Sequence, residues 1–301
     1  MHYALNLLPK QAILCLCLLL FGISSSAQTS RVDELLGQLK STDPDTVQIR
    51  VLRKLSAAYT SVDPIKKFYY ANQYRLLAEK NNIDSNIANG YLDMGISYGV
   101  RSNLDSALYY FKLGQQKARA SGYSNGVARS LVNIGFVYDR SDKKQQAVHC
   151  YEEALKIFRN LNYKKGINQC ITNLGAIYFD LKEYKSADNY FQQVLDNLKQ
   201  APGDEAGLAA ALFSLAGSKW RLGKHKISMD LYKKSLAIRE KIGDLNGIAL
   251  TNWGMSQLYI DKKEYKKALS HIDIALVNNR KLKNIYQECA VLLTLTDAYL
   301  G

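Results

Sequence analysis

Three five-residue stretches, MGISY at 94–98, IGFVY at 134–138 and LGAIY at 174–178, follow one another at a step of 40 residues. Each has an apolar residue, then a glycine, and a tyrosine three positions after that glycine. Continuing the step keeps a small residue in the glycine column, which reads Gly95, Gly135, Gly175, Ala216, Ser256 and Thr296. A fixed period of this length is typical of a solenoid, in which small units pack only against their neighbours and commonly bind partner molecules.

Each repeating unit is predicted to be a pair of helices. Leu174 and Tyr178 recur at helical spacing on a first helix, and Ala187 and Phe191 do the same on a second helix. Residues 180–183 form a short polar turn between them and leave no room for a strand. The small residues are expected to let the two helices of a pair approach closely.

A second glycine column lies nine residues before the first. It consists of Gly126, Gly166, Gly207 and Gly247. Because it closes polar stretches such as 121–125, we interpret it as the link between helix pairs, where one helix ends and the next begins.

The pattern within a unit resembles the tetratricopeptide repeat. The residues that carry the resemblance are Ile171, Leu174, Gly175, Tyr178, Ala187 and Phe191. The usual repeat has about 34 residues, so each repeat here has about six more. The family's leading tryptophan and late proline are absent. The resemblance covers roughly residues 45–301 and implies an all-α fold, a right-handed α-α superhelix of helix pairs.

This resemblance predicts the domain boundaries. They are a leading helix and linker at 28–44, a degenerate first repeat at 45–87, five repeats at 88–127, 128–167, 168–208, 209–248 and 249–288, and the first helix of an incomplete repeat at 289–301. We expect the protein to continue beyond Gly301, because Leu292, Leu295 and Tyr299 would otherwise have no second helix to face.

Residues 1–27 are predicted to be a signal peptide that is cleaved before Gln28. Lys10 supplies a weak positive charge, residues 12–23 are an unbroken apolar run, and residues 25–27 are small. A membrane anchor is the alternative, but a span needs about 20 apolar residues. The cysteines lie inside the apolar run, which disfavours a lipoprotein. We therefore expect export to the periplasm.

The chain is basic, with a formal net charge of +13 from 40 Lys and Arg against 27 Asp and Glu. Removal of the signal peptide takes away one lysine and leaves +12, which is 39 minus 27. A solvated surface and attraction to polyanions both fit this charge. Export argues against nucleic acid as the natural partner.

No catalytic motif is present, and we expect no enzymatic activity from these residues. The histidines are isolated, and no spacing fits a zinc site, a nucleophile elbow or a phosphate-binding loop. The predicted mature chain keeps Cys150, Cys170 and Cys289, an odd number without metal spacing, so they are interpreted as buried thiols. No cofactor or metal is expected.

In tetratricopeptide arrays the first helices line a concave surface, so the resemblance implies a candidate peptide-binding groove on them. Helical spacing places these residues there: Arg129, Asn133, Phe136, Arg140, Gln169, Asn173, Phe179, Phe213, Trp220, Trp253 and Gln257. The alternatives are solvated polar side chains or contacts between repeats for the asparagines, and core packing for the aromatic residues.

Asn133 and Asn173 share one column of this candidate groove, directly before the apolar-glycine pair. A carboxamide there can bind both the N–H and the C=O of an extended peptide, and the family commonly uses an asparagine in this place. The aromatic residues would anchor side chains, and Arg129 and Arg140 would bind a carboxylate.

We therefore expect an exported protein that binds a protein or peptide. Its architecture is similar to the N-terminal periplasmic region of bacterial membrane-bound sensor histidine kinases, which implies the sensor or scaffold part of a signalling protein. The alternatives are a free-standing periplasmic scaffold and a binder of anionic envelope polymers.

Overall fold

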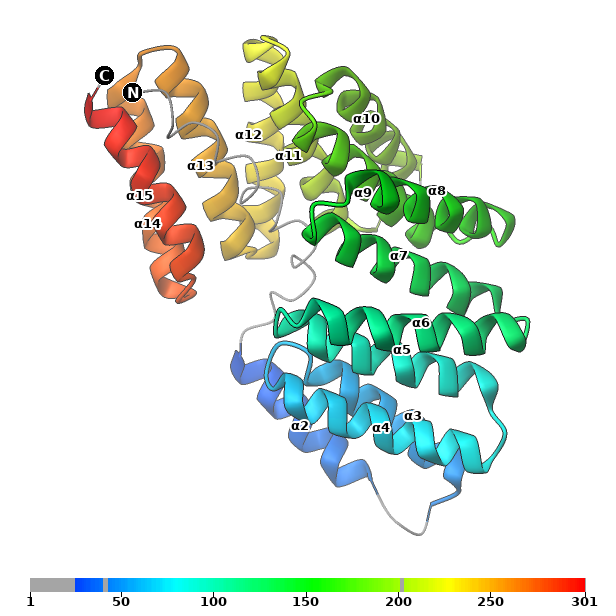
Figure 1. Ribbon diagram of the computed structural model, residues 1–301. Coiled ribbons are helices and arrows are strands. Elements are labelled where there is room, and N and C mark those ends of the chain that lie inside the picture. The colour runs from blue at the N-terminus through cyan, green and yellow to red at the C-terminus, as the bar shows by residue number, and fades with distance from the viewer. Residues whose placement is uncertain (1–24, 40–42, 201–202, 301) are drawn as a thin grey trace. The chain divides into compact units, whose positions relative to one another are not determined.

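The computed structural model describes residues 25–39, 43–200 and 203–300, in which every regular element is a helix (Figure 1). The helices are α2 Ser25–Gln38, α3 Asp45–Ala58, α4 Pro64–Lys80, α5 Asp84–Val100, α6 Leu104–Ala120, α7 Ser124–Arg140, α8 Lys144–Asn160, α9 Lys164–Asp180, α10 Tyr184–Gln200, α11 Glu205–Arg221, α12 His225–Ile242, α13 Leu245–Asp261, α14 Tyr265–Lys281 and α15 Ile285–Leu300. This confirms the all-α fold for these residues. Most of the predicted signal peptide, residues 1–24, lies outside them.

The described helices belong to two compact units, an N-terminal unit of residues 25–170 and a C-terminal unit of residues 171–300. In the N-terminal unit α3 packs with α4, α5 with α6 and α7 with α8. In the C-terminal unit α11 packs with α12 and α13 with α14. Figure 1 shows that each of these pairs is an antiparallel hairpin, as the sequence predicts. We call the members of a pair the first helix and the second helix.

From α4 onward, each turn between two helices contains a residue with positive φ. These residues are, in order, Asn82, Ser102, Gly122, Asp142, Asn162, Lys182, Gly203, Gly223, Gly243, Lys263 and Lys283. The helix pairs begin at residues 84, 124, 164, 205 and 245, so the predicted starts of the five repeats are each four residues late. The polar stretches that suggested those starts include the first turn of the following helix.

The first glycine column packs the two helices of a pair together. A Cβ at Gly95 would lie 2.5 Å from the Phe111 ring, and one at Gly175 would lie 2.7 Å from the Phe191 ring. Both distances are well below ordinary van der Waals contact. The close approach expected for these glycines is therefore confirmed.

The second glycine column does not form the links, and that interpretation is wrong. Gly126 and Gly166 are the third residues of α7 and α9 and are buried. A Cβ at Gly166 would meet the ring of Phe158 on the preceding second helix. These glycines allow the start of a first helix to approach the end of the second helix before it.

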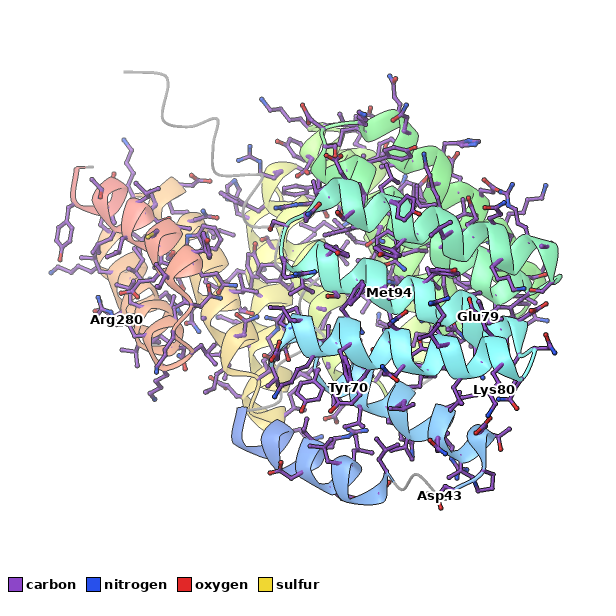
Figure 2. All side chains as sticks on the ribbon, turned by 60° about the horizontal axis from the view of Figure 1, so that its bottom comes forward. Asp43, Tyr70, Glu79, Lys80, Met94 and Arg280 are labelled. Atoms are coloured by element: carbon purple, nitrogen blue, oxygen red, sulfur yellow. The ribbon has the colours of Figure 1, made fainter. Side chains whose placement is uncertain are left out.

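The N-terminal unit begins with α2, whose Val32 and Leu35 are buried against Val51 and Leu55 of α3. Asp63 caps α4 by accepting hydrogen bonds from the backbone N–H groups of Ile65 and Lys66, at 3.0 and 3.1 Å. The next part of the core lies between α4 and α5, where Met94 is buried and Tyr70 packs at the edge (Figure 2).

In the C-terminal unit α15 packs on α14 and α13. Its other side is exposed, with Tyr286 91% and Tyr299 72% accessible. Leu292 is exposed as well, whereas Leu295 packs against the core around Trp253. None of the described helices is long and apolar enough to cross a membrane.

Candidate functional site

The first helices present a stripe of residues at their sixth, tenth, thirteenth and seventeenth positions, which steps of four and three place on one side of a helix. We call this surface the first-helix stripe. In the N-terminal unit it consists of Asn89, Asp93, Ile96 and Val100 on α5, Arg129, Asn133, Phe136 and Arg140 on α7, and Gln169 on α9. The candidate groove residues of this unit all belong to it.

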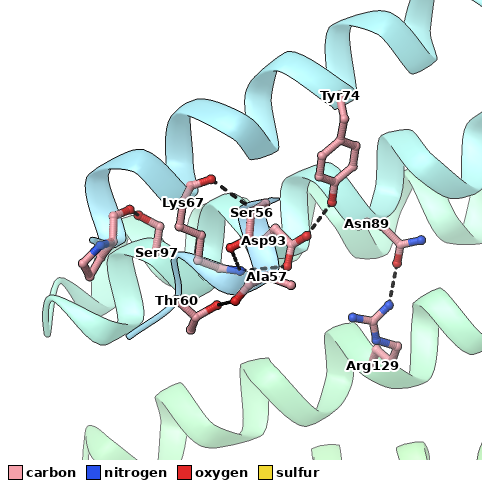
Figure 3. A network of polar contacts seen from close by, with 10 residues as sticks. Ser56, Ala57, Thr60, Lys67, Tyr74, Asn89, Asp93, Ser97 and Arg129 are labelled. Atoms are coloured by element: carbon pink, nitrogen blue, oxygen red, sulfur yellow. Dashed lines mark hydrogen bonds and ion pairs between the residues drawn. The ribbon is translucent and has the colours of Figure 1, made fainter. Parts of the chain in front are cut away.

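Arg129 joins two neighbouring first helices. Its Nη1 donates a hydrogen bond of 2.6 Å to Oδ1 of Asn89 on α5 (Figure 3). The guanidinium group carries five N–H donors. Arg129 is half-buried, and its other donors have no hydrogen-bond acceptor among the described residues. Its position is therefore held by one bond while most of its binding capacity stays available.

Asn133 lies one turn after Arg129 on the same stripe. One N–H of its Nδ2 donates to the backbone carbonyl of Arg129 at 2.9 Å, and the second N–H has no acceptor among the described residues. The two-sided contact with a peptide that the sequence suggested therefore stays a prediction. The Oδ1 atom has no donor among the described residues and can accept a hydrogen bond from a ligand N–H.

Asp93 occupies on α5 the position that Asn133 has on α7, but it serves the packing of the unit. Its carboxylate accepts hydrogen bonds from Nζ of Lys67 at 3.1 Å and from the hydroxyl of Tyr74 at 2.6 Å (Figure 3). Lys67 is only 2% exposed, and its Nζ also donates to the backbone carbonyl of Ser56 at 3.4 Å. This polar cluster ties α3, α4 and α5 together.

The charges of the cluster support one another. Burial raises the pKa of Asp93, but the nearby Lys67 ammonium, the Tyr74 hydroxyl and Arg129 outweigh burial, so the pKa lies below its usual value. Burial and the charge of Asp93 raise the pKa of Tyr74 well above its usual value. At neutral pH Asp93 is thus a carboxylate and Tyr74 a neutral hydrogen-bond donor.

The remaining candidates of the N-terminal unit lie at the solvent. Phe136 is half-buried, whereas Arg140 and Gln169 are exposed. Arg129, Asn133, Phe136 and Arg140 therefore form one accessible surface along α7, with two guanidinium groups, one amide oxygen and one aromatic ring.

In the C-terminal unit the two tryptophans connect first helices to one another. Trp253 is 4% exposed, and its indole N–H donates to Oγ1 of Thr294 on α15 at 2.8 Å. Its assignment as a groove anchor is therefore corrected, because it belongs to the core around Leu250 and Ile272. Trp220 is half-buried, and its indole N–H donates to Oδ2 of Asp261 on α13 at 2.5 Å.

The other candidates of this unit are covered to different degrees. Asn173 is 8% exposed, which leaves little of its amide for a peptide. Phe213 packs on the Tyr232 ring and under the buried Arg239 guanidinium, so it faces the second helix α12. Phe179 contacts Tyr184 edge to face, and Gln257 is half-buried.

The described residues contain no group of three or more His, Cys, Asp and Glu side chains able to hold a metal ion. Cys150 and Cys170 are buried free thiols, as the sequence predicts, whereas Cys289 is exposed. Burial raises the pKa of Cys170 to about 12, so this thiol is not a nucleophile at neutral pH.

The sequence profile of the tetratricopeptide repeat matches residues 86–160 and 169–241. The helix pairs of the structure extend this arrangement on both sides of the matched ranges. No curated protein sequence matches the chain.

Several solved structures share the fold. BtubC (BKLC) from P. vanneervenii is 17% identical with a TM-score of 0.59, over 72% of this chain and 90% of that chain. A Rap protein complexed with Competence and Sporulation Factor is 15% identical with a TM-score of 0.60, over 91% and 86% of the two chains. Aspartyl phosphate phosphatase F from Bacillus subtilis is 12% identical with a TM-score of 0.56, over 98% and 94%. At these identities the likeness shows the fold alone.

Proposed function

Because the chain is a tetratricopeptide-repeat protein, we propose that it is a binding scaffold whose first-helix stripe along α7 holds an extended peptide segment of a partner protein. The observation that carries the proposal is the pairing of Arg129 and Asn133. Arg129 is held in place by Asn89 and offers free guanidinium donors, and Asn133 offers its amide oxygen one turn further on.

These groups complement a peptide backbone. The Asn133 oxygen accepts from a peptide N–H, and Arg129 donates to a carbonyl or a carboxylate of the same segment. Phe136 supplies an apolar contact and Arg140 a second positive charge. Hydrogen bonds to a charged group contribute about 1.5–3 kcal/mol each, so Arg129 is the residue on which affinity depends most.

The test starts from peptides selected on the purified protein from a randomised display library. Their affinity is then measured by fluorescence anisotropy for the wild type and for Arg129→Ala, Asn133→Ala and Arg159→Ala. We expect Arg129→Ala to weaken binding about 10-fold to 100-fold, since each 1.4 kcal/mol is a factor of about ten. Arg159 is an exposed arginine on the second helix α8, so its replacement is the matched control.

Unchanged affinity of both stripe variants, with the same thermal unfolding as the wild type, would exclude this surface. Equal losses in all three variants would instead indicate a general effect of positive charge on acidic peptides.

We further propose that the protein is exported and acts as the sensor or scaffold part of a signalling protein. The pattern of residues 1–27 supports export. The structural neighbour complexed with Competence and Sporulation Factor supports a role in recognising a specific ligand. Mass spectrometry of the protein purified from its native cells tests export, since a mature chain beginning at Gln28 is expected and an intact Met1 would contradict it.

The signalling role has a separate test. Crosslinking in intact cells followed by mass spectrometry is expected to recover a component of a signalling system with this protein. Recovery of envelope structural proteins alone would favour the free-standing scaffold.

A further inference from the structure

A pocket of about 490 Å³ lies on the opposite side of α7, between the second helices α6 and α8. Leu131 and Ile134 of α7 and Cys150 of α8 are buried in its floor, and Tyr138 stands at the side. It opens to solvent between α6 and α8. None of the first-helix stripe residues lines it, so it is a second surface.

The position of this pocket follows from a column of stacked rings. The fifteenth position of α5, α7, α9 and α13 carries a tyrosine, and in α5, α9 and α13 its ring stacks on the ring at the seventh position of the second helix. In α11 this position is Lys219, and the column is interrupted there. The stacked pairs are Tyr98 with Tyr110, with ring centroids 5.5 Å apart, Tyr178 with Tyr190 at 5.4 Å, and Tyr259 with His271 at 5.4 Å. Tyr59 and Tyr70 make the same contact at 5.3 Å across α3 and α4.

In the α7–α8 pair this column lacks one ring. Cys150 occupies the seventh position of α8, where α6 has Tyr110 and α10 has Tyr190. Tyr138 therefore makes no ring contact among the described residues. The space that a second tyrosine fills in the flanking pairs is part of the pocket beside Tyr138 and Cys150.

Cys150 itself does not make this pocket a reactive site. Burial raises the pKa of its thiol to about 11, and Glu153 adds to the effect. The thiol is thus protonated at neutral pH and acts as a small apolar wall.

The rim of the pocket is positively charged. Lys112 and His149 are exposed and have no ion-pair partner among the described residues. Arg119 also lines the pocket and forms an exposed ion pair of 3.0 Å with Glu153. The lining therefore has two cationic side chains, Lys112 and Arg119, against the single carboxylate of Glu153, which favours an anionic ligand.

We propose that this pocket binds an aromatic side chain that is flanked by acidic residues on a partner protein, with its ring stacked on Tyr138 where the flanking pairs place a tyrosine of their own. The apolar floor accepts the ring, the positive charge of Lys112 attracts a flanking carboxylate, and the His149 imidazole supplies a further hydrogen-bond donor. A side chain carried by a larger partner fits a site that is open to solvent on one side.

The probe is a capped acidic heptapeptide with one central tryptophan and a fluorophore, compared with the same peptide carrying a central alanine. We expect the intact protein to bind the tryptophan peptide about tenfold or more tightly, because an aromatic ring gains both apolar burial and stacking. The affinity should fall as salt is raised.

The decisive variant is Cys150→Tyr, which restores the ring that Tyr110 and Tyr190 provide in the flanking pairs. It should fill the pocket, raise or preserve the melting temperature, and remove the preference for the tryptophan peptide. Cys150→Ala keeps the pocket open and should keep the preference. If Cys150→Tyr does not fold, Tyr138→Ala replaces it, since loss of the stacking face should reduce the preference at least severalfold.

Equal binding of the two peptides to the wild type, or an unchanged preference in Cys150→Tyr, overturns the proposal. Binding of free N-acetyltryptophan as tightly as the peptide would show that the site takes a small aromatic acid and would overturn the protein partner. Arg129 does not line this pocket, so Arg129→Ala tests only peptide binding at the first-helix stripe. The two proposals can therefore fail independently of each other.

Discussion

Helix propensity alone predicts that Gly175→Ala stabilises the protein, but the packing of Gly175 against Phe191 predicts that this gain is lost. Alanine is preferred over glycine inside a helix by about 1 kcal/mol, so Gly175→Ala would stabilise a free helix. In the protein, however, the new Cβ would lie 2.7 Å from Cε1 and 2.9 Å from Cδ1 of Phe191. Phe191 is buried and has little room to move, and overpacking costs about 1–3 kcal/mol. We therefore expect Gly175→Ala to be neutral or to destabilise by up to about 2 kcal/mol.

Gly217 is the matched control in the same unit. It also lies inside a helix, but its Cβ would be 3.7 Å from the nearest atom, which belongs to Phe179. Gly217→Ala should therefore stabilise the protein by about 1 kcal/mol, which corresponds to about 2–4 °C in melting temperature.

Urea denaturation followed by far-ultraviolet circular dichroism measures both variants, and Phe191→Leu with Gly175→Ala/Phe191→Leu completes a double-mutant cycle. Removal of the ring edge should relieve the clash, so the double variant is expected to be more stable than the sum of the single changes predicts. The reasoning is refuted if Gly175→Ala stabilises the protein as much as Gly217→Ala does.

The buried polar cluster and a helix cap give three further predictions. Lys67→Met leaves the Asp93 carboxylate unpaired and should cost about 3–5 kcal/mol by urea denaturation, with much of it regained in Lys67→Met/Asp93→Leu. Folding lowers the pKa of Asp93, so the ionised Asp93 carboxylate stabilises the folded protein fully above its usual pKa of 3.8, and this stabilisation is lost as the pH falls below that value. Asp93→Asn should therefore flatten the acid side of a profile of unfolding free energy against pH. Asp63→Ala should cost about 1 kcal/mol of thermal stability through the lost cap of α4.

The fold was predictable because its determinants are local and repeated. A glycine or another small residue three positions before a tyrosine, with alanine and an aromatic residue on the next helix, describes the contact between two helices that are neighbours in sequence. Gly175 meets Phe191 in this way, and the same contact recurs at the same spacing in Gly95 with Phe111 and in Gly135 with Tyr151. Such a contact can be read from one unit and checked in the next.

The tryptophans were less predictable because their partners belong to the following repeat. Trp220 and Trp253 lie beside the first-helix stripe, at the sixteenth and ninth positions of their helices. Their indole N–H groups reach Asp261 and Thr294, each 41 residues further on. Neither acceptor stands out in the sequence. Helical periodicity gives the side of a helix that a residue occupies, but whether a neighbouring helix covers that side depends on tertiary packing.

Asp93 was visible in the sequence, because it precedes Met94 and Gly95 as Asn133 precedes Ile134 and Gly135. A carboxylate at a position where the next two units have an amide, Asn133 and Asn173, indicates a different partner. The partner, Lys67, has no such signal, since a lysine on a second helix is expected at the surface. The sequence alone therefore could not predict this polar cluster, and the structure was needed to identify it.

The length of the repeat also explains the second glycine column. A repeat of about 34 residues divides into two halves of about 17, each made of a helix and its turn. Here the helix alone has 17 residues in each of α5, α6, α7 and α8, before its turn is added. Each helix is therefore longer than in the usual repeat by about three residues, close to one turn of about 3.6.

The added turns lie at one end of the helix pair. The spacing from Gly175 to Ala187 is the family's own, so the extra length lies away from the turn that joins the two helices of a pair. At that far end the first turn of a first helix meets the last turn of the preceding second helix, as Gly126 meets Ala118. The glycines of the second column thus allow the longer helices to pack closely where they cross.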